Sequence, residues 1–340
     1  MVWKVPAADE KRLSTALPVE DVPERPQPWM LHMLEVNTMN FCAFAACPVN
    51  AVESFEQASE TLIAVPNTLE SEAVDIFQLP SQTRLHTVRP GKANGMAMCL
   101  GLLHFEGHLL LVSAFENGYA SVHRLELDGS WTVTYRSQAH TQPILSLDIH
   151  PSKEYFLTSS ADATIAKHPL PLCQKETEPA FDPNNRIIEE VDEAPSKPSL
   201  RSAPTQNTGP KLVKAHNEVL RTVHTKHSGQ QSLHIRSDGR IFATAGWDSQ
   251  VRVYSCKTLK ELAVLSWHKV GCYAAAFAEV DAPGNIPAAD AKGEREASTA
   301  VALGSKGSIS VKERRIHQAR AAHWIVAGAK DGRVSLWDIY

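Results

Sequence analysis

Short stretches in which apolar and polar residues alternate recur along most of the chain, and the clearest of them covers residues 233–255. Residues 237–239 (Ser-Asp-Gly) are a turn signal, because Asp can hydrogen-bond its own backbone and Gly tolerates positive φ. Residues 241–245 form a compact apolar run that suits a strand buried on both faces. Beyond Asp248, residues 251–255 alternate with the period of two that a strand requires. The stretch therefore predicts an antiparallel meander.

The same pattern predicts an all-β chain in five groups of strands separated by turns. The predicted strands are residues 33–46, 61–65, 73–79 and 85–88; 96–105, 108–114, 120–127 and 131–135; 144–150, 155–160 and 164–168; the meander with 259–265; and 272–278, 324–328 and 334–339. Residues 2–5 are a further strand signal without predicted neighbours. In the fourth group, which is expected to start at residues 215–216, Trp247 and Tyr254 are expected to be buried.

Three segments interrupt this pattern. Residues 6–28 are charged and contain five prolines, so they are predicted to be a connector without a central strand. Residues 170–211 contain seven prolines and an acidic cluster at 189–193, and residues 281–322 are rich in Ala, Gly and charge. Such compositions bury too little apolar surface to offset chain ordering. Both are therefore predicted to be disordered surface insertions in one domain that spans residues 1–340.

Composition narrows the class of protein. The 340 residues are 43 % apolar, which is enough for a core. The formal charge of -4 provides no cationic field, so direct binding to nucleic acid is not predicted. No apolar run approaches the roughly 20 residues that cross a bilayer, and the polar N-terminus offers no secretory signal. The six cysteines are scattered, which is typical of reduced thiols in an intracellular protein.

A histidine opens each of the last three groups, and an aspartate lies in the turn between their second and third strands. These landmarks are His140, His216 and His268, then Asp162, Asp248 and Asp331, with Trp337 at the end of the last group. The spacing supports a repeat. From His140 to His168 there are 28 residues, and from His268 to Trp337 there are 27 once the 42 residues of the second insertion are left out.

These landmarks resemble the WD-repeat family, in which a unit of about 40 to 45 residues forms one four-stranded blade of a β-propeller. A buried aspartate in the turn can accept hydrogen bonds from the imidazole and from backbone N–H groups, which satisfies polar atoms in each blade. We therefore interpret the landmarks as architectural, and we assign them no catalytic, cofactor-binding or metal-binding role.

Other constellations carry weaker signals. His224 and His227 could offer two metal ligands, but no partner follows at zinc-site spacing, so a solvated loop is favoured. Cys42 and Cys47 flank small apolar residues and are predicted to be core thiols. Residues 312–315 (Lys-Glu-Arg-Arg) are either a nuclear-import patch or solubilising charge. No nucleophile is placed with a base by a recognisable signature, so no enzymatic activity is predicted.

Four longer runs are similar to a narrower family. They are PWMLHMLEVNTMNFCAFAACP (28–48), SDGRIFATAGWDSQVRVYS (237–255), LKELAVLSWHKVGCYAAAFAE (259–279) and VAGAKDGRVSLWDIY (326–340). They resemble the fungal ASTRA-associated WD-repeat family, whose animal relative is the G-protein β-subunit-like WD protein. These runs are more specific than the WD landmarks, because they include the residues between them.

The resemblance implies a non-enzymatic scaffold subunit of the ASTRA complex that needs no cofactor. It implies a part in chromatin remodelling and in the Tel2-Tti-dependent maturation of phosphatidylinositol-3-kinase-like kinases. The partners that it implies are proteins, namely the Tel2-Tti proteins, a Tra-type kinase and AAA+ helicases. It also predicts a nuclear location and leaves the cytoplasm open as a second one.

The resemblance further implies seven blades, whereas five groups and the strand at residues 2–5 are recognisable. The first blade and most of the second have no predicted strands. Because a propeller closes by joining its first and last blades, an open ring would leave unpaired edges. We therefore expect that the initiator methionine lies upstream of Met1, or else that the expressed chain is poorly soluble alone.

Four alternative functions use related folds. A substrate receptor of a cullin ubiquitin ligase would end a blade in Trp-Asp-x-Arg, but Tyr340 follows residues 337–339 here. A generic WD-repeat adaptor remains compatible with the pattern. A G-protein β-type subunit would need an N-terminal coiled-coil helix, and the proline-rich start has no heptads. A propeller enzyme would need titratable groups that converge at the channel mouth, which only a structure can show.

Overall fold

The computed structural model describes residues 1–4, 28–37, 40–52, 58–91, 94–170, 217–279 and 322–339. Within these ranges every regular element of four residues or more is a β-strand, which confirms the all-β prediction. The same ranges contain no helix that is long and apolar enough to cross a membrane.

The strands form a series of antiparallel sheets in which consecutive strands pair. A two-stranded sheet joins β1 (Val2–Lys4) and β2 (Trp29–His32). Four sheets have four strands: β3 (Ala45–Pro48), β4 (Thr61–Pro66), β5 (Val74–Leu79) and β6 (Thr83–Val88); β7 (Ala97–Phe105), β8 (His108–Phe115), β9 (Tyr119–Leu125) and β10 (Trp131–Gln138); β11 (Ile144–Ile149), β12 (Tyr155–Ser160), β13 (Thr164–Pro169) and β14 (Arg221–His224); β15 (Gln230–Ile235), β16 (Ile241–Gly246), β17 (Gln250–Ser255) and β18 (Glu261–Ser266). The last described sheet has β19 (Cys272–Phe277), β20 (Trp324–Ala329) and β21 (Val334–Asp338).

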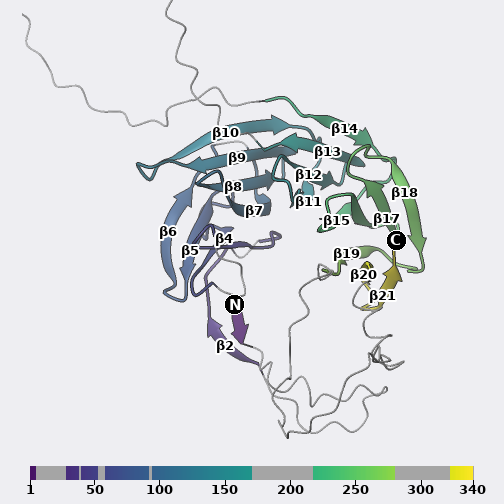
Figure 1. Cartoon of the computed structure of the whole chain (residues 1–340), viewed down its shortest axis with the longest axis horizontal. Coiled ribbons are helices and arrows are strands. Elements are labelled where there is room, and N and C mark those ends of the chain that lie inside the picture. Colours follow the sequence, from purple (N-terminus) through teal and green to yellow (C-terminus); the bar gives the residue numbers. More distant parts are fainter. Residues whose placement is uncertain are drawn as a thin grey trace, which may run out of the picture.

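The five larger sheets lie side by side in an arc (Figure 1). Strands β7, β11 and β15 lie on the inside of this arc, and β6, β10, β14 and β18 lie on the outside. The first strands of neighbouring sheets contact one another, from β3 and β7 through β15 and β19. Four-stranded sheets stacked in this way are the blades of a WD-repeat β-propeller, which confirms the predicted fold class and its five recognisable blades.

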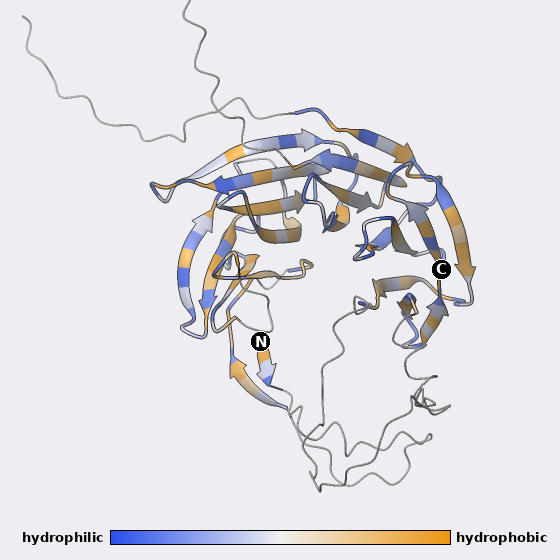
Figure 2. Cartoon of the chain, viewed as in Figure 1, coloured by the Kyte–Doolittle hydropathy of each residue, from blue (hydrophilic) through white to orange (hydrophobic). Residues whose placement is uncertain are grey.

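Neighbouring blades share apolar cores. Leu111 of β8 packs in a cluster with Ile76 of the preceding blade, whereas Val112 belongs to a cluster with Phe156 of the following blade. The middle strands therefore need apolar residues on both faces. Strand β16 is buried at every position, which explains why residues 241–246 are apolar or small, with Thr244 as the one polar side chain. Figure 2 shows such apolar positions on the strands of every blade.

The predicted strand at residues 33–46 is wrong. Strand β2 ends at His32 and β3 begins only at Ala45, and no described residue between them is in a strand. Within this interval the Asn40 side chain accepts a 2.7 Å hydrogen bond from the N–H of Cys42, a local interaction that competes with strand pairing. Strand β2 instead pairs with β1, so the strand at residues 2–5 has a partner after all.

Strand β14 is absent from the sequence prediction. It pairs with β13, from Thr164 opposite His224 to Lys167 opposite Arg221. Three of its four residues are exposed, so no apolar alternation marks it. The assignment of His224 to a solvated loop is therefore wrong, and so is the assignment of residues before 225 to the fourth blade. The third blade is completed by the chain after the first insertion.

Other predictions lie in the parts of the chain that the structure does not describe. Residues 5–27, 171–216 and 280–321 contain nearly all of the predicted connector 6–28 and of the insertions 170–211 and 281–322, together with His216 and residues 312–315. These assignments stay predictions.

Candidate functional site

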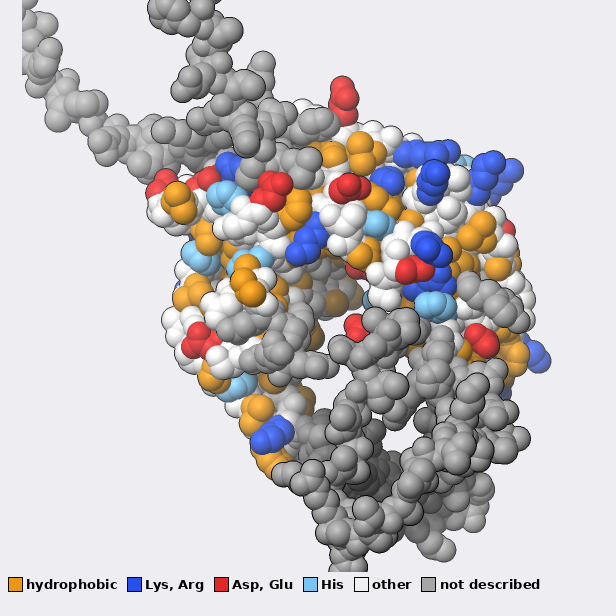
Figure 3. All heavy atoms as spheres, in the orientation of Figure 1, with side chains coloured by type: hydrophobic (Ala, Val, Ile, Leu, Met, Phe, Trp, Pro, Cys, Tyr) orange, Lys and Arg blue, Asp and Glu red, His pale blue; other side chains and the backbone are white. Residues whose placement is uncertain are grey.

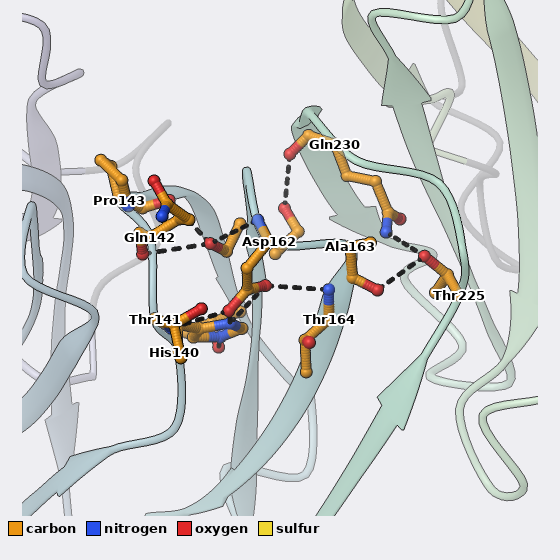
Figure 4. Close-up of polar contacts among 12 residues, drawn as sticks. His140, Thr141, Gln142, Pro143, Asp162, Ala163, Thr164, Thr225 and Gln230 are labelled. Atoms are coloured by element: carbon orange, nitrogen blue, oxygen red, sulfur yellow. Dashed lines mark hydrogen bonds and ion pairs between the residues drawn. The ribbon is translucent and has the colours of Figure 1, made fainter.

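The third blade joins two of the predicted landmarks. Asp162 lies in the turn between β12 and β13, and His140 lies in the connection from β10 to β11 (Figure 4). The Nδ1 atom of His140 is 3.2 Å from Oδ1 and 3.3 Å from Oδ2 of Asp162. The backbone N–H groups of Thr141 and Thr164 each donate to the same carboxylate at 2.9 Å. Asp162 thereby fastens its own turn to the connection that opens the blade.

This pair is one end of a longer buried network. The Nε2 atom of His140 lies 2.7 Å from the Thr158 hydroxyl, which lies 2.8 Å from Nε2 of His168. The Nδ1 atom of His168 is 2.8 Å from the Tyr135 hydroxyl. One set of donors satisfies every contact: Tyr135 donates to His168, His168 to Thr158, Thr158 to His140, and His140 to Asp162. In this arrangement the chain of hydrogen bonds ends on the carboxylate of Asp162.

The ionisation of Asp162 follows from these contacts. Burial alone would raise its pKa, but the hydrogen bond from His140 and those from Thr141 and Thr164 lower the pKa of Asp162 to about 2. Its carboxylate is therefore charged at every physiological pH. Since both nitrogens of His140 are engaged, the pair has no free base to offer to a substrate.

Tyr135→Phe is expected to lower the free energy of unfolding by about 1–2 kcal/mol, because it leaves Nδ1 of the buried His168 without a hydrogen-bond partner. Tyr254→Phe is the matched control, since the Tyr254 hydroxyl is also buried but makes no hydrogen bond within the described residues. Urea denaturation of both variants measures the difference. Equal losses of stability would show that the bond from Tyr135 to His168 contributes nothing.

In the fourth blade a histidine that was not among the predicted landmarks lies near Asp248. His227 lies between β14 and β15, and its Nδ1 is 3.7 Å from Oδ2 of Asp248. It precedes Asp248 by 21 residues, close to the 22 residues between His140 and Asp162, whereas His216 precedes it by 32. His227 therefore lies near Asp248 at nearly the spacing of His140 and Asp162, whereas His216 lies outside the described residues and its role stays a prediction. The spacing to the aspartate was the signal that could have found His227.

Asp248 is held mainly by an arginine. Burial would raise its pKa, but the guanidinium of Arg252, which donates to Oδ2 at 2.6 Å, and the N–H of Gln250 keep the pKa of Asp248 below its ordinary value. The turn is thus fastened within its own hairpin, with His227 as a more distant partner.

The fifth blade does not form the expected pair. Nε2 of His268 lies 2.8 Å from the Ser335 hydroxyl, which also accepts a 2.9 Å hydrogen bond from Nε1 of Trp337. The Nδ1 atom of His268 has no hydrogen-bond partner among the described residues. Asp331 accepts from the N–H of Arg333 at 3.1 Å and lies 3.5 Å from its guanidinium. The predicted contact between His268 and Asp331 is therefore replaced by two others. Ser335 engages His268, and Arg333 engages Asp331.

The geometry agrees with a comparison to protein families. Residues 131–166 and 217–255 match the model of the family described as WD domain, G-beta repeat. The first match contains His140 and Asp162, and the second contains His227 and Asp248. The pairs that the structure brings together therefore fall inside recognised WD repeats.

Full-length similarity is more specific. The chain is 46 % identical over 389 aligned residues to ASTRA-associated protein 1 of Pyricularia oryzae, and the match covers 100 % of the chain and 81 % of that relative. The chain belongs to the ASTRA-associated protein 1 family. The family member of Verticillium alfalfae is 48 % identical over 341 residues, covering 100 % of the chain and 74 % of the relative. That of Schizosaccharomyces pombe is 28 % identical over 268 residues, covering 71 % and 60 %. The resemblance found in the sequence is confirmed.

The remaining candidate residues of this family member do not form a reactive centre. Cys42 and Cys47 are free and buried, as predicted, and burial raises the pKa of each thiol to about 12. Such thiols are poor nucleophiles because the thiolate is not populated. Within the described ranges no group of three or more His, Cys, Asp or Glu side chains could hold a metal ion.

Two buried histidines make stability depend on pH. Burial and the neighbouring His140 lower the pKa of His168 to about 3, and burial and the charge of Arg136 lower the pKa of His123 to about 4. In the unfolded chain both would titrate near pH 6.5. Between these values the unfolded state binds protons that the folded state does not, so stability falls as the pH is lowered.

We expect the two histidines together to make the unfolding free energy fall by about 2.7 kcal/mol per pH unit near pH 5, at about 1.4 kcal/mol per histidine. His123→Leu removes one of them and should halve that contribution, without a large loss of stability at pH 7, because neither ring nitrogen of His123 has a hydrogen-bond partner among the described residues. Urea denaturation at several pH values measures the slope. An unchanged slope in His123→Leu would contradict the assignment.

Basic side chains gather on one part of the surface. Figure 3 shows them over the region of β14 and β18 at the outer side of the arc. A groove of about 400 Å³ lies here, and it is lined by Arg221, His224, Lys260, Glu261 and Leu259 among others. It lies between the outer strand of the third blade and residues 254–261 of the fourth blade.

One aromatic residue is more exposed than the sequence predicts. Tyr254 is buried as expected, but Trp247 is 46 % exposed. Trp247 lies in the turn between β16 and β17, outside the strands, so burial of the meander does not extend to its ring. Exposed aromatic residues at loops are candidates for contacts with proteins.

Proposed function

We propose that the chain is a non-enzymatic scaffold subunit of the ASTRA complex that acts by binding other proteins. The observation that carries the proposal is the match over the whole chain to relatives named ASTRA-associated protein 1. A WD-repeat propeller supports it, because a rigid ring of blades presents many loops to partners at once.

The chemistry of the landmarks supports a role without catalysis. The buried polar side chains of the third blade form hydrogen bonds with one another and with the backbone. These residues are His140, Thr158, Asp162 and His168. Catalytic groups instead need a free donor or acceptor that faces a substrate. The buried network therefore serves the stability of the blade.

The proposed cellular role is in chromatin remodelling and in the maturation of phosphatidylinositol-3-kinase-like kinases together with the Tel2-Tti proteins. The proposed location is the nucleus, where the Tra-type kinase and AAA+ helicases would be further partners. A non-enzymatic subunit would act here by holding partners together, so its loss should change their abundance and not a reaction rate.

Rapid depletion tests this role. A conditional degradation tag is placed on the chain in its own cells, and newly synthesised kinases of this class are followed by pulse labelling. The proposal predicts that these kinases are lost after depletion while their transcripts are unchanged, and that an unrelated kinase is unaffected. Unchanged levels of every kinase of the class would refute the part in kinase maturation.

A further inference from the structure

Three apolar side chains meet at one exposed place between the fourth and fifth blades. Trp247 lies in the turn between β16 and β17, Val270 in the connection from β18 to β19, and Tyr273 near the start of β19. Their side chains are 46 %, 36 % and 44 % exposed. We call these three residues the aromatic patch.

Gly271 brings the patch together. A Cβ atom added at this residue would lie 3.1 Å from the backbone oxygen of Trp247 and 3.3 Å from Cε2 of Tyr273. The turn of one blade and the first strand of the next are thus in contact at this point. The ring of Tyr273 and the backbone of Trp247 therefore both lie beside Gly271, and Val270 precedes Gly271 directly in the chain.

The Trp247 ring is held in place. It lies against Gly229, where an added Cβ would overlap the ring. Its Nε1 donates a 2.9 Å hydrogen bond to Oε1 of Gln231, and its backbone N–H donates to the oxygen of Gly229 at 3.0 Å. A ring that is already ordered loses little conformational entropy when a partner binds, which favours its use as an anchor.

The free charge beside the patch is positive. Lys269 precedes Val270, and the backbone N–H of Lys330 donates to the oxygen of Gly271 at 3.0 Å, so both lysines flank the patch. Both are exposed, and neither ammonium group forms an ion pair within the described residues. The neighbouring carboxylates are engaged, Asp248 with Arg252 and Asp331 with Arg333.

We propose that the aromatic patch binds an acidic peptide segment of a partner protein. An aliphatic or aromatic side chain of the segment would pack against Trp247 and Tyr273, and its carboxylates would lie near Lys269 and Lys330. Aromatic rings with lysines can also bind single-stranded nucleic acid. Nucleic-acid binding draws most of its free energy from many neutralised phosphates, and two lysines offer few such contacts. A peptide can in addition pack an apolar side chain against Trp247 and Tyr273, so the peptide is the better occupant.

A binding measurement with defined probes tests the proposal. The probes are a short fluorescein-labelled peptide of leucine and glutamate, the same peptide with lysine for glutamate, a third with serine for leucine, and labelled poly(dT). Fluorescence polarisation should show saturable binding of the first peptide, weakened by salt, and weaker binding of the other three. Preference for the lysine peptide or for poly(dT), or the absence of saturable binding, would overturn the proposal.

Variants locate the site. Trp247→Ala should weaken binding of the leucine-glutamate peptide about tenfold or more, because buried aromatic anchors dominate interface energies. The double charge reversal Lys269→Glu with Lys330→Glu should weaken binding, and the remaining binding should no longer be weakened by salt, because salt would then screen a repulsion. This variant alters only exposed side chains, so it decides the matter if Trp247→Ala impairs folding. Phe41→Ala is the matched control, since Phe41 is 70 % exposed and lies before the first larger sheet. Equal affinity of all variants would place the binding elsewhere and refute the patch.

Discussion

Asp162→Ala is expected to lower the free energy of unfolding by about 3 kcal/mol, because it removes a carboxylate that accepts from His140, Thr141 and Thr164 and leaves the buried imidazole without its partner. Asp331→Ala removes the residue at the corresponding turn of the fifth blade. Asp331 forms no hydrogen bond or ion pair with His268, and its side chain is partly exposed, so we expect a loss of about 1 kcal/mol or less.

Urea denaturation at pH 7 compares the two variants. The pair of substitutions is matched in residue type and in position within the blade, so the difference reports the network of the third blade. If both variants lose the same stability, the aspartate acts only through its own turn and the contact with His140 contributes nothing.

Gly118→Ala is expected to cost about 4 kcal/mol or more. Gly118 has a φ of 78°, and an added Cβ would overlap the carbonyl oxygen of His140, a backbone atom that cannot rotate away. Gly129 has a nearly identical φ of 80°, but nothing lies within 4 Å of its added Cβ. Gly129→Ala should therefore show only the cost of the left-handed conformation, about 1–2 kcal/mol.

Thermal and urea unfolding of these two variants separate backbone strain from steric overlap. Similar losses in both would mean that the connection carrying His140 shifts at little cost. The close approach of Gly118 to the His140 carbonyl would then not be what holds His140 beside Asp162.

Much of the fold could be predicted because blade strands carry a local signal. The meander at 233–255 alternates or is wholly apolar, and the structure places β15, β16 and β17 there. Strand β14 could not be found in this way, since it is an exposed edge that pairs only with β13. Its partner lies across the first insertion, and such a long-range pairing leaves no periodic trace in the sequence.

The landmarks were predicted less well than the strands. Residue type and spacing identified His140 and Asp162, which the structure brings together. They could not show that Ser335 would engage His268, because that contact depends on which side chain a neighbouring strand presents. His216 was chosen in place of His227 because the boundary of the third blade was misplaced. The exposure of Trp247 was missed because the turn was treated as part of the buried meander.

The structure separates two uses of polar and aromatic residues in this family member. Those within the blades, such as Tyr135 and His168, are buried and hold sheets together. Trp247, in a turn, is exposed, and its ring is held by a hydrogen bond to Gln231. A scaffold needs both, since a rigid frame lowers the entropy cost of presenting a binding surface.

The central claim, that the chain acts as an ASTRA subunit, is tested most directly by affinity purification with quantitative mass spectrometry. The chain is tagged at its own locus, and an untagged strain provides the background. The account predicts enrichment of the Tel2-Tti proteins, a Tra-type kinase and AAA+ helicases with the tagged chain. Recovery of a cullin or a G-protein γ subunit without any of these proteins would contradict it.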